Sequence, residues 1–474
     1  MKVLLTGANG YIGRRLKQHL LKNREVQLRI FVRNKKSLSP EVLAVHEIIE
    51  GDTFDKEALR NALEGVDTAY YLIHSLNKPN YKELDKLSAQ NFIDTATACG
   101  VKRVVYLGGL GVKNSDTSEH LLSRLETGEI LSSSKTTQTL WIRAGVIIGS
   151  GSASFEIIRH LVEKLPVLIT PKWVDTLAQP IAVDDVIDYL ASSLYLKYDK
   201  NLIVDIGSEK MPYREMMLQT AKALGLKRYL LPVPFMSINL SSYWLNLFTP
   251  VPFKVAKALI EGLRSEVVIQ NDNAQKYYPH IKPMAYVQAV QKAVDEIEQQ
   301  QVISRWSDAD GTMWDKAHAK QINDAVFVDR QEASIDGYDK EKVFKTITSL
   351  GGGHGWYDYD FLWEIRGVID KILGGAGLNR GRRDICDLRL GECVDFWRVE
   401  DIEPNQRLLL FAQMKLPGQA WLEFKIIDNR LIQSAYFYPR GIWGRIYWYA
   451  MKPMHFFIFK NMIKGILNES AQRE

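Results

Sequence analysis

Three glycines near the N-terminus have the spacing of a phosphate-binding turn. An apolar run, residues 2–6, leads into Gly7-x-x-Gly10-x-x-Gly13 and then into an amphipathic stretch. The first glycine lets the chain turn sharply off a strand, the second admits a pyrophosphate, and the third lets the next helix pack closely. Amides at the helix start then face the phosphates. The pattern predicts a dinucleotide site, the alternative being a turn that binds nothing. Its residues are Gly7, Asn9, Gly10, Tyr11, Ile12 and Gly13.

The end of the second apolar run indicates which dinucleotide is bound. NAD-binding domains place an acidic residue there, which accepts hydrogen bonds from the ribose hydroxyls. The run 28–32 ends instead at Arg33, which can pair with a 2′-phosphate, and Arg14 and Arg15 can assist it. We therefore predict NADP in preference to NAD, the alternative being that these arginines are merely solvated. Asp52 follows a shorter strand-like run that ends before Gly51, and it is expected to hold the adenine amino group.

Three polar side chains at strand ends are the candidates for chemistry. His74 and Ser75 follow the apolar run 69–73, at a strand end where ligands of doubly wound folds bind, and Tyr106 lies in the apolar run 103–107. His74 is also expected to face the pyrophosphate or the nicotinamide ribose. A histidine can donate a proton near neutral pH, whereas the alternative for His74 is a plain hydrogen-bonding role at a strand end.

Alternating apolar runs and amphipathic stretches predict the fold. Residues 1–150 have near-continuous apolar runs at 3–5, 28–32, 69–73, 103–107 and 140–148, as in a parallel sheet covered on both faces. The alternation continues less regularly to residue 300. We predict a doubly wound α/β domain over 1–300, a polar linker over 301–325 and an α+β domain over 326–470, with strands at 407–415 and 420–427.

Composition excludes several classes of protein. The net charge of +5 over 474 residues gives no basic stripe for nucleic acid. Three cysteines without zinc spacing predict no metal site, and the missing signal peptide predicts a cytoplasmic protein. The uncharged run 229–253 contains four prolines and a polar middle, so contact with a membrane surface is not favoured over burial. The run 443–467 is interrupted by Lys452, His455, Lys460 and Lys464 and predicts an amphipathic helix.

Longer motifs resemble two known families. Residues 1–300 resemble the atypical, NmrA-like branch of the short-chain dehydrogenase/reductase superfamily, and 326–470 resemble the domain of unknown function DUF2867. The first resemblance implies a Rossmann-type domain that binds NAD(P). The second implies a START-like helix-grip fold, in which a curved sheet wraps a long C-terminal helix around an apolar cavity. The matching stretches include TGANGYIG at 6–13, YYLIHS at 70–75, RVVYLGGLG at 103–111, IRAGVIIGSGS at 142–152, QPIAVDDV at 179–186, GGGHGWYDYDFLWEIRG at 351–367 and GRIYWYAMKPMHFFIF at 444–459.

The chain departs from the reductase family at its catalytic positions. The resemblance implies a Tyr-x-x-x-Lys pair on the helix expected at 120–131, in which the lysine lowers the tyrosine pKa, with a Ser or Thr on the preceding strand. Leu121 and Leu125 stand where the Tyr and Lys belong, and Gly108-Gly109 where the Ser or Thr belongs. Ordinary reductase chemistry therefore lacks its usual proton donor, and no catalytic residue is assigned beyond the candidates above.

Three functions stay open on the sequence. The first is an NADP(H)-dependent oxidoreductase acting on an apolar substrate. The second is a non-catalytic NADP(H) sensor or scaffold, and the third is a carrier of a hydrophobic ligand such as a lipid or quinone. Six tryptophans of the second domain either line such a ligand cavity or form plain core: Trp356, Trp363, Trp397, Trp421, Trp443 and Trp448. The basic loop 374–383 either binds an anionic head group or is solvated.

Overall fold

The chain divides into two compact units, Met1–Ala309 and Asp310–Glu474. The computed structural model describes residues 1–38, 42, 46–74, 80–113, 117–233, 249, 253–263, 265–299, 301–306, 322, 325–357, 360–372, 377 and 388–472. Ser75, most of the uncharged run 229–253 and most of the loop 374–383 lie outside these residues. Each unit is described by itself.

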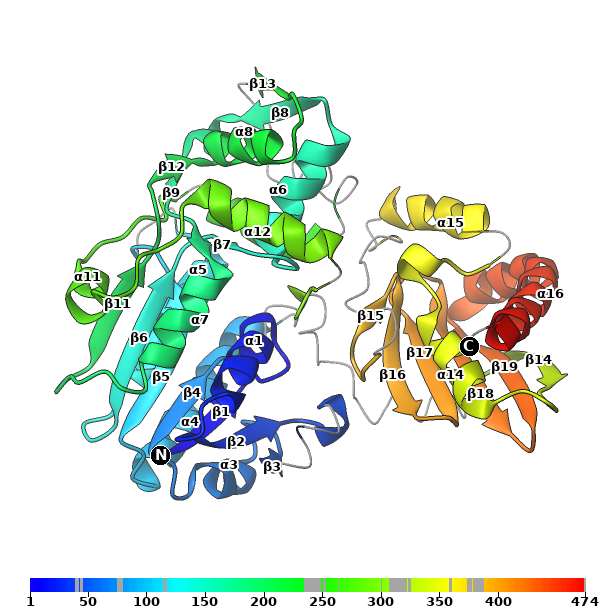
Figure 1. The fold of residues 1–474 in the computed structure, drawn as a ribbon, viewed down its shortest axis with the longest axis horizontal. Helices are drawn as coiled ribbons and strands as arrows, with labels where there is room; N and C mark the ends of the chain where they lie inside the picture. The colour runs from blue at the N-terminus through cyan, green and yellow to red at the C-terminus, as the bar shows by residue number, and fades with distance from the viewer. Residues whose placement is uncertain are drawn as a thin grey trace. The chain divides into compact units, whose positions relative to one another are not determined.

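A seven-stranded parallel sheet forms the centre of the first unit (Figure 1). Its strand order is β11-β6-β5-β4-β1-β2-β3, which reverses direction at β1, as in doubly wound folds. The predicted α/β Rossmann-type fold is confirmed. The strands are β1 (Lys2–Thr6), β2 (Gln27–Val32), β3 (Glu47–Glu50), β4 (Thr68–Tyr71), β5 (Arg103–Gly109), β6 (Gln138–Ala144) and β11 (Leu202–Ile206).

Helices cover both faces of this sheet. On one face α1 (Tyr11–Leu21) and α7 (Val183–Ser192) pack together over apolar residues of the sheet. On the other face lie α3 (Lys56–Leu63), α4 (Tyr81–Ala98) and α5 (Glu119–Leu131). Burial on both sides explains why the strands read as continuous apolar runs rather than as alternating ones.

The chain after β6 builds a smaller layer with its own apolar core around α6, α8 and α12. The predicted strand 140–148 is two strands, because a Cβ at Gly145 would lie 2.4 Å from the Gln179 carbonyl oxygen where the chain bends away. The elements of this layer are β7 (Ile147–Ile148), α6 (Ala153–Lys164), β8 (Val167–Pro171), β9 (Leu177–Ala178), β10 (Ile181–Ala182), β12 (Met211–Pro212), α8 (Tyr213–Ala223), β13 (Tyr229–Val233), α10 (Phe253–Gly262) and α12 (Tyr286–Glu298). The short α11 (Asn273–Tyr277) packs instead against β11 of the main sheet.

The start of the expected linker packs on the first unit. Ser304 is fully buried and donates a hydrogen bond from Oγ to the Tyr11 carbonyl oxygen, 2.8 Å away. The Trp306 amide bonds to the Gly151 carbonyl oxygen at 2.8 Å. Residues 301–306 therefore belong to the folded surface beneath the glycine turn.

An antiparallel six-stranded sheet, ordered β14-β19-β18-β17-β16-β15, forms the second unit. Its helices are α14 (Lys340–Ser349), α15 (Asp360–Ile372) and the 32-residue α16 (Gly441–Gln472). The predicted α+β architecture is confirmed, whereas the START-like resemblance stays a prediction. The strands are β14 (Phe327–Ser334), β15 (Cys393–Val394), β16 (Trp397–Glu403), β17 (Arg407–Ala412), β18 (Gly418–Ile427) and β19 (Arg430–Pro439).

Most of the tryptophans of the second unit are buried. Trp356, Trp363 and Trp397 belong to the core between the sheet and its helices. Trp421 lies in a smaller cluster with Leu409 and Phe411. Among the helices that the structure describes, none is long and apolar enough to cross a membrane, although α16 covers the expected amphipathic run 443–467.

Candidate active site

The glycine turn is built as its spacing predicts. Gly7 ends β1 with a φ of +66°, and a Cβ there would lie 2.4 Å from the Leu72 carbonyl oxygen. A Cβ at Gly13 would lie 2.1 Å from the Gly7 carbonyl oxygen, so the helix packs directly on the turn. Gly10 is less crowded, since the atom nearest its Cβ position is 3.2 Å away. The first and third glycines therefore close the turn, and the second leaves space above it.

The start of α1 offers unpaired polar groups to a phosphate. Gly10 caps the helix without a side-chain hydrogen bond, and its first turn holds no acidic residue. Three amides, those of Tyr11, Ile12 and Gly13, follow the cap, and their partial positive charge favours an anion. The residues at this turn therefore fit the pyrophosphate of a dinucleotide.

The side chains of the turn have separate tasks. Asn9 donates from Nδ2 to Ser37 Oγ at 2.6 Å, which ties the turn to the segment after β2. The Tyr11 hydroxyl points under Gly149, whose added Cβ would lie 2.8 Å from it, and has no hydrogen-bond partner among the described residues. Burial raises the Tyr11 pKa. The Tyr11 side chain is therefore buried beneath the turn, whereas its backbone amide lies at the start of α1.

The three arginines predicted for the 2′-phosphate differ in their surroundings. Arg33 is exposed at the carboxyl end of β2. Arg14 is buried and donates from Nε to the Asn9 carbonyl oxygen at 3.0 Å. Arg15 is buried beneath the turn, where its Nη2 lies 3.2 Å from Glu296 Oε2. Arg15 is thus not available to a phosphate, which corrects the prediction that it assists Arg33.

Asp52 lies at the carboxyl end of the next strand, as the sequence predicts. It follows β3, and its Oδ1 accepts from Thr53 Oγ1 and from the Phe54 amide, both at 3.3 Å. These bonds orient the carboxylate at the same edge of the sheet as Arg33. The edge therefore presents one cation and one carboxylate on neighbouring strands.

Apolar side chains fill the space that the reductase family uses for its catalytic groups. Leu121 and Leu125 on α5 are buried in the core of the sheet face. A Cβ at Gly109 would lie 2.7 Å from Leu121 Cδ1, and one at Gly108 would lie 2.3 Å from Trp141 Nε1. A Ser or Thr at either glycine would require Leu121 or Trp141 to shift, so these vacant positions are occupied by apolar packing.

Tyr106, one of the proposed substitutes for the catalytic tyrosine, lies inside the unit. Tyr106 is buried, and its hydroxyl donates to the Arg124 carbonyl oxygen at 3.0 Å. Burial raises the pKa of Tyr106 to about 12. Tyr106 is therefore wrong as a proton donor, because its hydroxyl is already engaged inside the unit. Ser75 lies outside the described residues.

His74, the remaining candidate, belongs to a chain of three polar side chains. Its Nδ1 lies 2.5 Å from Asp85 Oδ2, and its Nε2 lies 3.1 Å from Nδ1 of His120. Asp85 is buried on α4, whereas His74 keeps 24% of its side chain accessible. His120 stands on the first turn of α5, directly before Leu121. Three segments of the chain thus bring a carboxylate and two imidazoles into line.

Burial governs the protonation of this group. It holds the pKa of His120 well below the ordinary histidine value, and the nearby charges of His74 and Arg124 lower that pKa further. His120 is therefore neutral at pH 7. A neutral imidazole carries one N–H and one lone pair, and its neighbours decide which nitrogen carries the hydrogen.

Sequence reasoning missed Asp85 and His120. His120 is next to Leu121, the vacant tyrosine position, and a search of the neighbouring helix positions for a titratable residue would have found it. Asp85 has no comparable signal, because it lies on a different helix and meets His74 only in the folded chain.

Two family models match the chain. Residues 7–145 match an NAD(P)H-binding family, and residues 321–462 match the family described as "Protein of unknown function (DUF2867)". Among curated proteins, the chain is 23% identical over 267 residues to a (4-alkanoyl-5-oxo-2,5-dihydrofuran-3-yl)methyl phosphate reductase of Streptomyces griseus, which covers 55% of this chain and 85% of the relative. It is 31% identical over 117 residues to sterol demethylase protein B of Methylococcus capsulatus, covering 23% of this chain and 35% of that protein.

Solved structures share the fold of the first unit. A nucleoside-diphosphate-sugar epimerase from Staphylococcus aureus superposes with a TM-score of 0.52 at 16% identity, covering 61% of this chain and all of the epimerase. Triphenylmethane reductase from Citrobacter sp. gives 0.51 at 19% identity, covering 62% of this chain and all of the reductase. At these identities the likeness concerns the fold. The chain joins an N-terminal NAD(P)H-binding Rossmann domain to a C-terminal domain of the DUF2867 family.

Proposed function

We propose that this protein is an NADP(H)-dependent oxidoreductase of the atypical short-chain type, acting on an apolar substrate. The observation that carries the proposal is the glycine turn, with its crowded first and third glycines and the uncapped start of α1. The reductase name of the Streptomyces relative supports the class of reaction. We further propose domain limits of 1–300 and 326–470, with a linker between them.

The cofactor site in this proposal lies along the carboxyl edge of the sheet. The glycine turn holds the pyrophosphate, Arg33 pairs with the 2′-phosphate, Asp52 holds the adenine and His74 lies toward the nicotinamide. A guanidinium meets a phosphate with two parallel hydrogen bonds, which favours NADP over NAD at Arg33. The full set of proposed residues is Gly7, Asn9, Gly10, Tyr11, Ile12, Gly13, Arg33, Asp52 and His74.

Charge reversal at the two ends of β2 tests the preference for NADP. Arg33 follows the carboxyl end of the strand, whereas Arg24 is exposed before its amino end. We expect Arg33→Glu to weaken NADPH binding about tenfold or more, at about 1.4 kcal/mol per decade, and to leave NADH binding nearly unchanged. Calorimetry of both reduced cofactors with the full chain measures the two affinities.

Arg24→Glu is the matched control, because it changes the net charge equally at the opposite edge of the sheet. Equal losses for NADPH and NADH in Arg33→Glu, or an equal loss in Arg24→Glu, would contradict the role of Arg33. Folded wild-type protein that binds neither cofactor would overturn the oxidoreductase proposal itself.

A second candidate function is a sensor that binds NADP(H) without turnover. It is favoured by the apolar packing of Leu121, Leu125 and Trp141, which leaves no room for the family's catalytic side chains. Both functions predict NADPH binding. Consumption of NADPH with any aldehyde or ketone rules out the sensor.

We also propose that the C-terminal domain holds a hydrophobic small molecule. Trp421, Phe411 and Leu409, with Tyr436 beside them, gather apart from the main core of that domain, on a separate part of the sheet. Native mass spectrometry of the full chain tests this proposal. A ligand mass that disappears on delipidation and returns on adding oleate or a quinone supports it, and an unchanged protein mass after both additions contradicts it.

A further inference from the structure

We infer that His120 is the catalytic acid of the N-terminal domain, that His74 passes it a proton and that Asp85 positions His74. This inference rests on the proposed oxidoreductase function and names the proton donor that the family's missing tyrosine leaves open. The substrate class that fits is an aldehyde or ketone, whose oxygen must gain a proton when its carbon gains a hydride.

The relay lies at the edge of the sheet where the cofactor is expected. The glycine turn contacts the start of the segment after β4, since a Cβ at Gly7 would lie 2.4 Å from the Leu72 carbonyl oxygen. His74 follows Leu72 by two residues. The end of β5 contacts the first turn of α5 in the same way, since a Cβ at Gly111 would lie 2.3 Å from Leu121 Cδ2. Ligands of open α/β sheets bind at this carboxyl edge.

Hydrogen-bond partners fix the tautomers of the two imidazoles. A carboxylate only accepts hydrogen bonds, so the 2.5 Å contact with Asp85 places a hydrogen on Nδ1 of His74. Nε2 of His74 and Nδ1 of His120 share one hydrogen across 3.1 Å. The contact of His120 with His74 uses Nδ1, so Nε2 lies on the opposite side of the ring. That nitrogen is the end of the relay that can meet a substrate.

In its acid form the relay carries one proton more than two neutral imidazoles, so that Nδ1 and Nε2 of His74 and Nε2 of His120 each hold a hydrogen. A bound reduced nicotinamide would supply the hydride, a hydrogen with two electrons, that the carbonyl carbon gains. Nε2 of His120 gives its hydrogen to the carbonyl oxygen, which receives the π electrons. The Nε2 hydrogen of His74 then moves to Nδ1 of His120, and Nδ1 of His74 keeps its hydrogen on Asp85. One proton leaves the pair. After product release Nε2 of His120 takes a proton from solvent, and the Nδ1 hydrogen of His120 returns to Nε2 of His74.

Charged and aromatic groups surround the relay. Burial and the charge of Arg124 lower the pKa of His120, and the Asp85 carboxylate faces Nδ1 of His74. Tyr81 meets the His74 ring edge-on, with 6.3 Å between ring centroids. Beside the relay, Lys82 and Glu119 form an exposed ion pair at 2.9 Å, and Glu261 of α10 acts on the Tyr81 hydroxyl.

Two variants of the relay test its role in catalysis. With the full chain, NADPH and the probes benzaldehyde, cinnamaldehyde and 1-phenyl-1,2-propanedione, we expect His120→Gln to lower kcat about 10²- to 10⁴-fold. NADPH affinity measured by calorimetry should stay unchanged. We expect Asp85→Asn to lower kcat less and to move the acidic limb of the pH–kcat profile. His280→Gln is the matched control, since His280 is exposed and outside the relay.

The outcomes separate the relay from the cofactor proposal. Wild-type protein that binds NADPH but consumes none with any of the three probes overturns the relay and leaves cofactor binding standing. Absence of NADPH binding overturns the proposed function first. A His120→Gln variant that loses NADPH affinity together with kcat shows a structural role and also overturns the relay. Partial recovery of kcat in His120→Ala on adding imidazole supports proton donation by that side chain.

A spectroscopic measurement tests the relay without turnover. In ¹⁵N spectra of labelled full chain, we expect His120 to stay neutral at pH values well below the ordinary histidine pKa, and Nδ1 of His74 to hold a hydrogen. Asp85→Asn should let the two tautomers of His74 mix. Ordinary titration of His120 together with an unchanged His74 in Asp85→Asn would contradict the geometry.

Discussion

The glycine turn and the histidine relay lie at the same edge of the same sheet, but they are built in opposite ways. The turn uses the backbone of seven consecutive residues, Gly7 to Gly13, and needs almost nothing from its side chains. The relay uses three side chains from three separate elements, at positions 74, 85 and 120. A site made from backbone atoms can be recognised from the spacing of a few neighbouring residues in the sequence. A site made from side chains of separate elements forms only once the chain has folded.

The difference also concerns energy. Backbone amides at the start of a helix are unpaired in any helix, so the turn requires no buried charge of its own. Side-chain sites bury ionisable groups, which lose hydration and must find partners. The relay, the Arg15–Glu296 pair and Glu400 in the second unit all belong to this kind. Substitutions in the glycine turn and in the buried side-chain sites should therefore lower stability and binding for different physical reasons.

The largest effect is expected where the backbone packs most tightly. Gly13→Ala places a methyl group 2.1 Å from the Gly7 carbonyl oxygen, which cannot move without opening the turn. We expect a loss of stability of about 3 kcal/mol or more and no measurable NADPH binding. Thermal unfolding followed by circular dichroism, with calorimetry of NADPH, measures both.

Gly10→Ala is the matched comparison within the same turn. Its methyl group would lie 3.2 Å from the Gly7 carbonyl oxygen, which needs to shift by only a few tenths of an ångström, so the Tm should fall far less than in Gly13→Ala. NADPH binding should nevertheless weaken, because the methyl group occupies the approach of the pyrophosphate. If Gly10→Ala bound NADPH as well as the wild type, the turn would not be the phosphate site.

A buried ion pair beneath the turn gives the next largest effect. Arg15 has 2% of its side chain accessible and donates from Nη2 to Ser150 and Glu296, the last at 3.2 Å. Glu296→Ala leaves that guanidinium buried without its carboxylate, and we expect a loss of about 3–5 kcal/mol. Glu298→Ala, an exposed position on the same helix, should cost little. Equal unfolding midpoints in urea for both variants would show that the pair contributes nothing.

The fold could be predicted further than the site. The five apolar runs given for residues 1–150 correspond to β1, β2, β4, β5 and β6 of the first sheet, because burial on both faces leaves a continuous signal. The apolar run 140–148 was expected to form one strand, but the structure divides it between β6 and β7. Sequence periodicity does not predict the bend at Gly145, where the chain meets the distant Gln179. Likewise, nothing in local sequence tells that Arg15 faces Glu296, 281 residues further along the chain.

The parts of the site also differ in how far the sequence predicts them. The glycine turn, and Arg33 in place of an acidic residue, can be recognised in short stretches of sequence. The vacant positions Leu121 and Leu125 were found through family resemblance, and the structure adds that Trp141 fills the space beside them. His74 was identified by its place at a strand end, but its partners Asp85 and His120 were not, since the contact joins α4 and α5.

The smallest of these effects concerns a buried carboxyl in the second unit. Glu400 on β16 accepts a hydrogen bond at Oε2 from Trp421 Nε1, 2.9 Å away. Its Oε1 is buried and has no hydrogen-bond partner among the residues that the structure describes. Burial raises the pKa of Glu400 from 4.5 to about 7, against the opposing effects of the Trp421 bond and of Arg398 and Arg407. Glu400 is thus a side-chain site whose partners only partly offset its burial.

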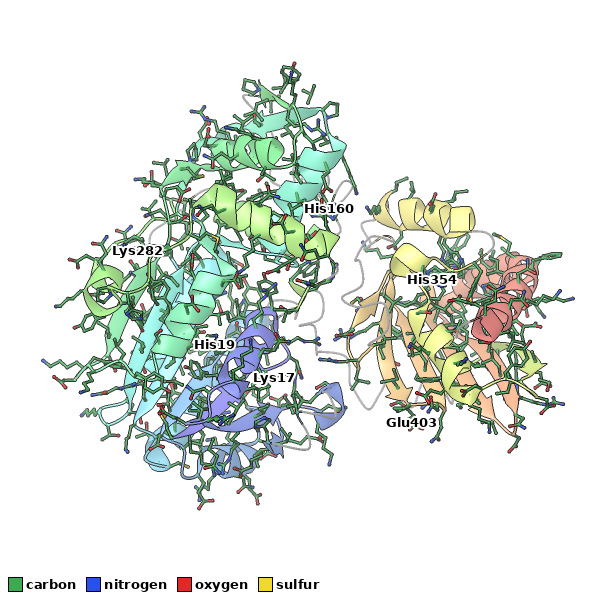
Figure 2. The ribbon with its side chains drawn as sticks, viewed as in Figure 1. Lys17, His19, His160, Lys282, His354 and Glu403 are labelled. Atoms are coloured by element: carbon green, nitrogen blue, oxygen red, sulfur yellow. The ribbon has the colours of Figure 1, made fainter. Side chains whose placement is uncertain are left out.

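Replacing this carboxyl by an amide should remove a pH dependence of stability. Between pH 4.5 and about 7 the folded chain keeps a proton on Glu400 that the unfolded chain releases, so this group lowers stability as pH rises through that window. Glu400→Gln should therefore raise stability at pH 8 by up to about 3 kcal/mol and change it little at pH 4. Eight of the 11 tryptophans follow residue 300, so their fluorescence during urea unfolding reports mainly on this unit. Glu403→Gln, on the exposed end of the same strand (Figure 2), is the control, and a variant difference that does not grow from pH 4 to pH 8 would show that Glu400 is ionised throughout.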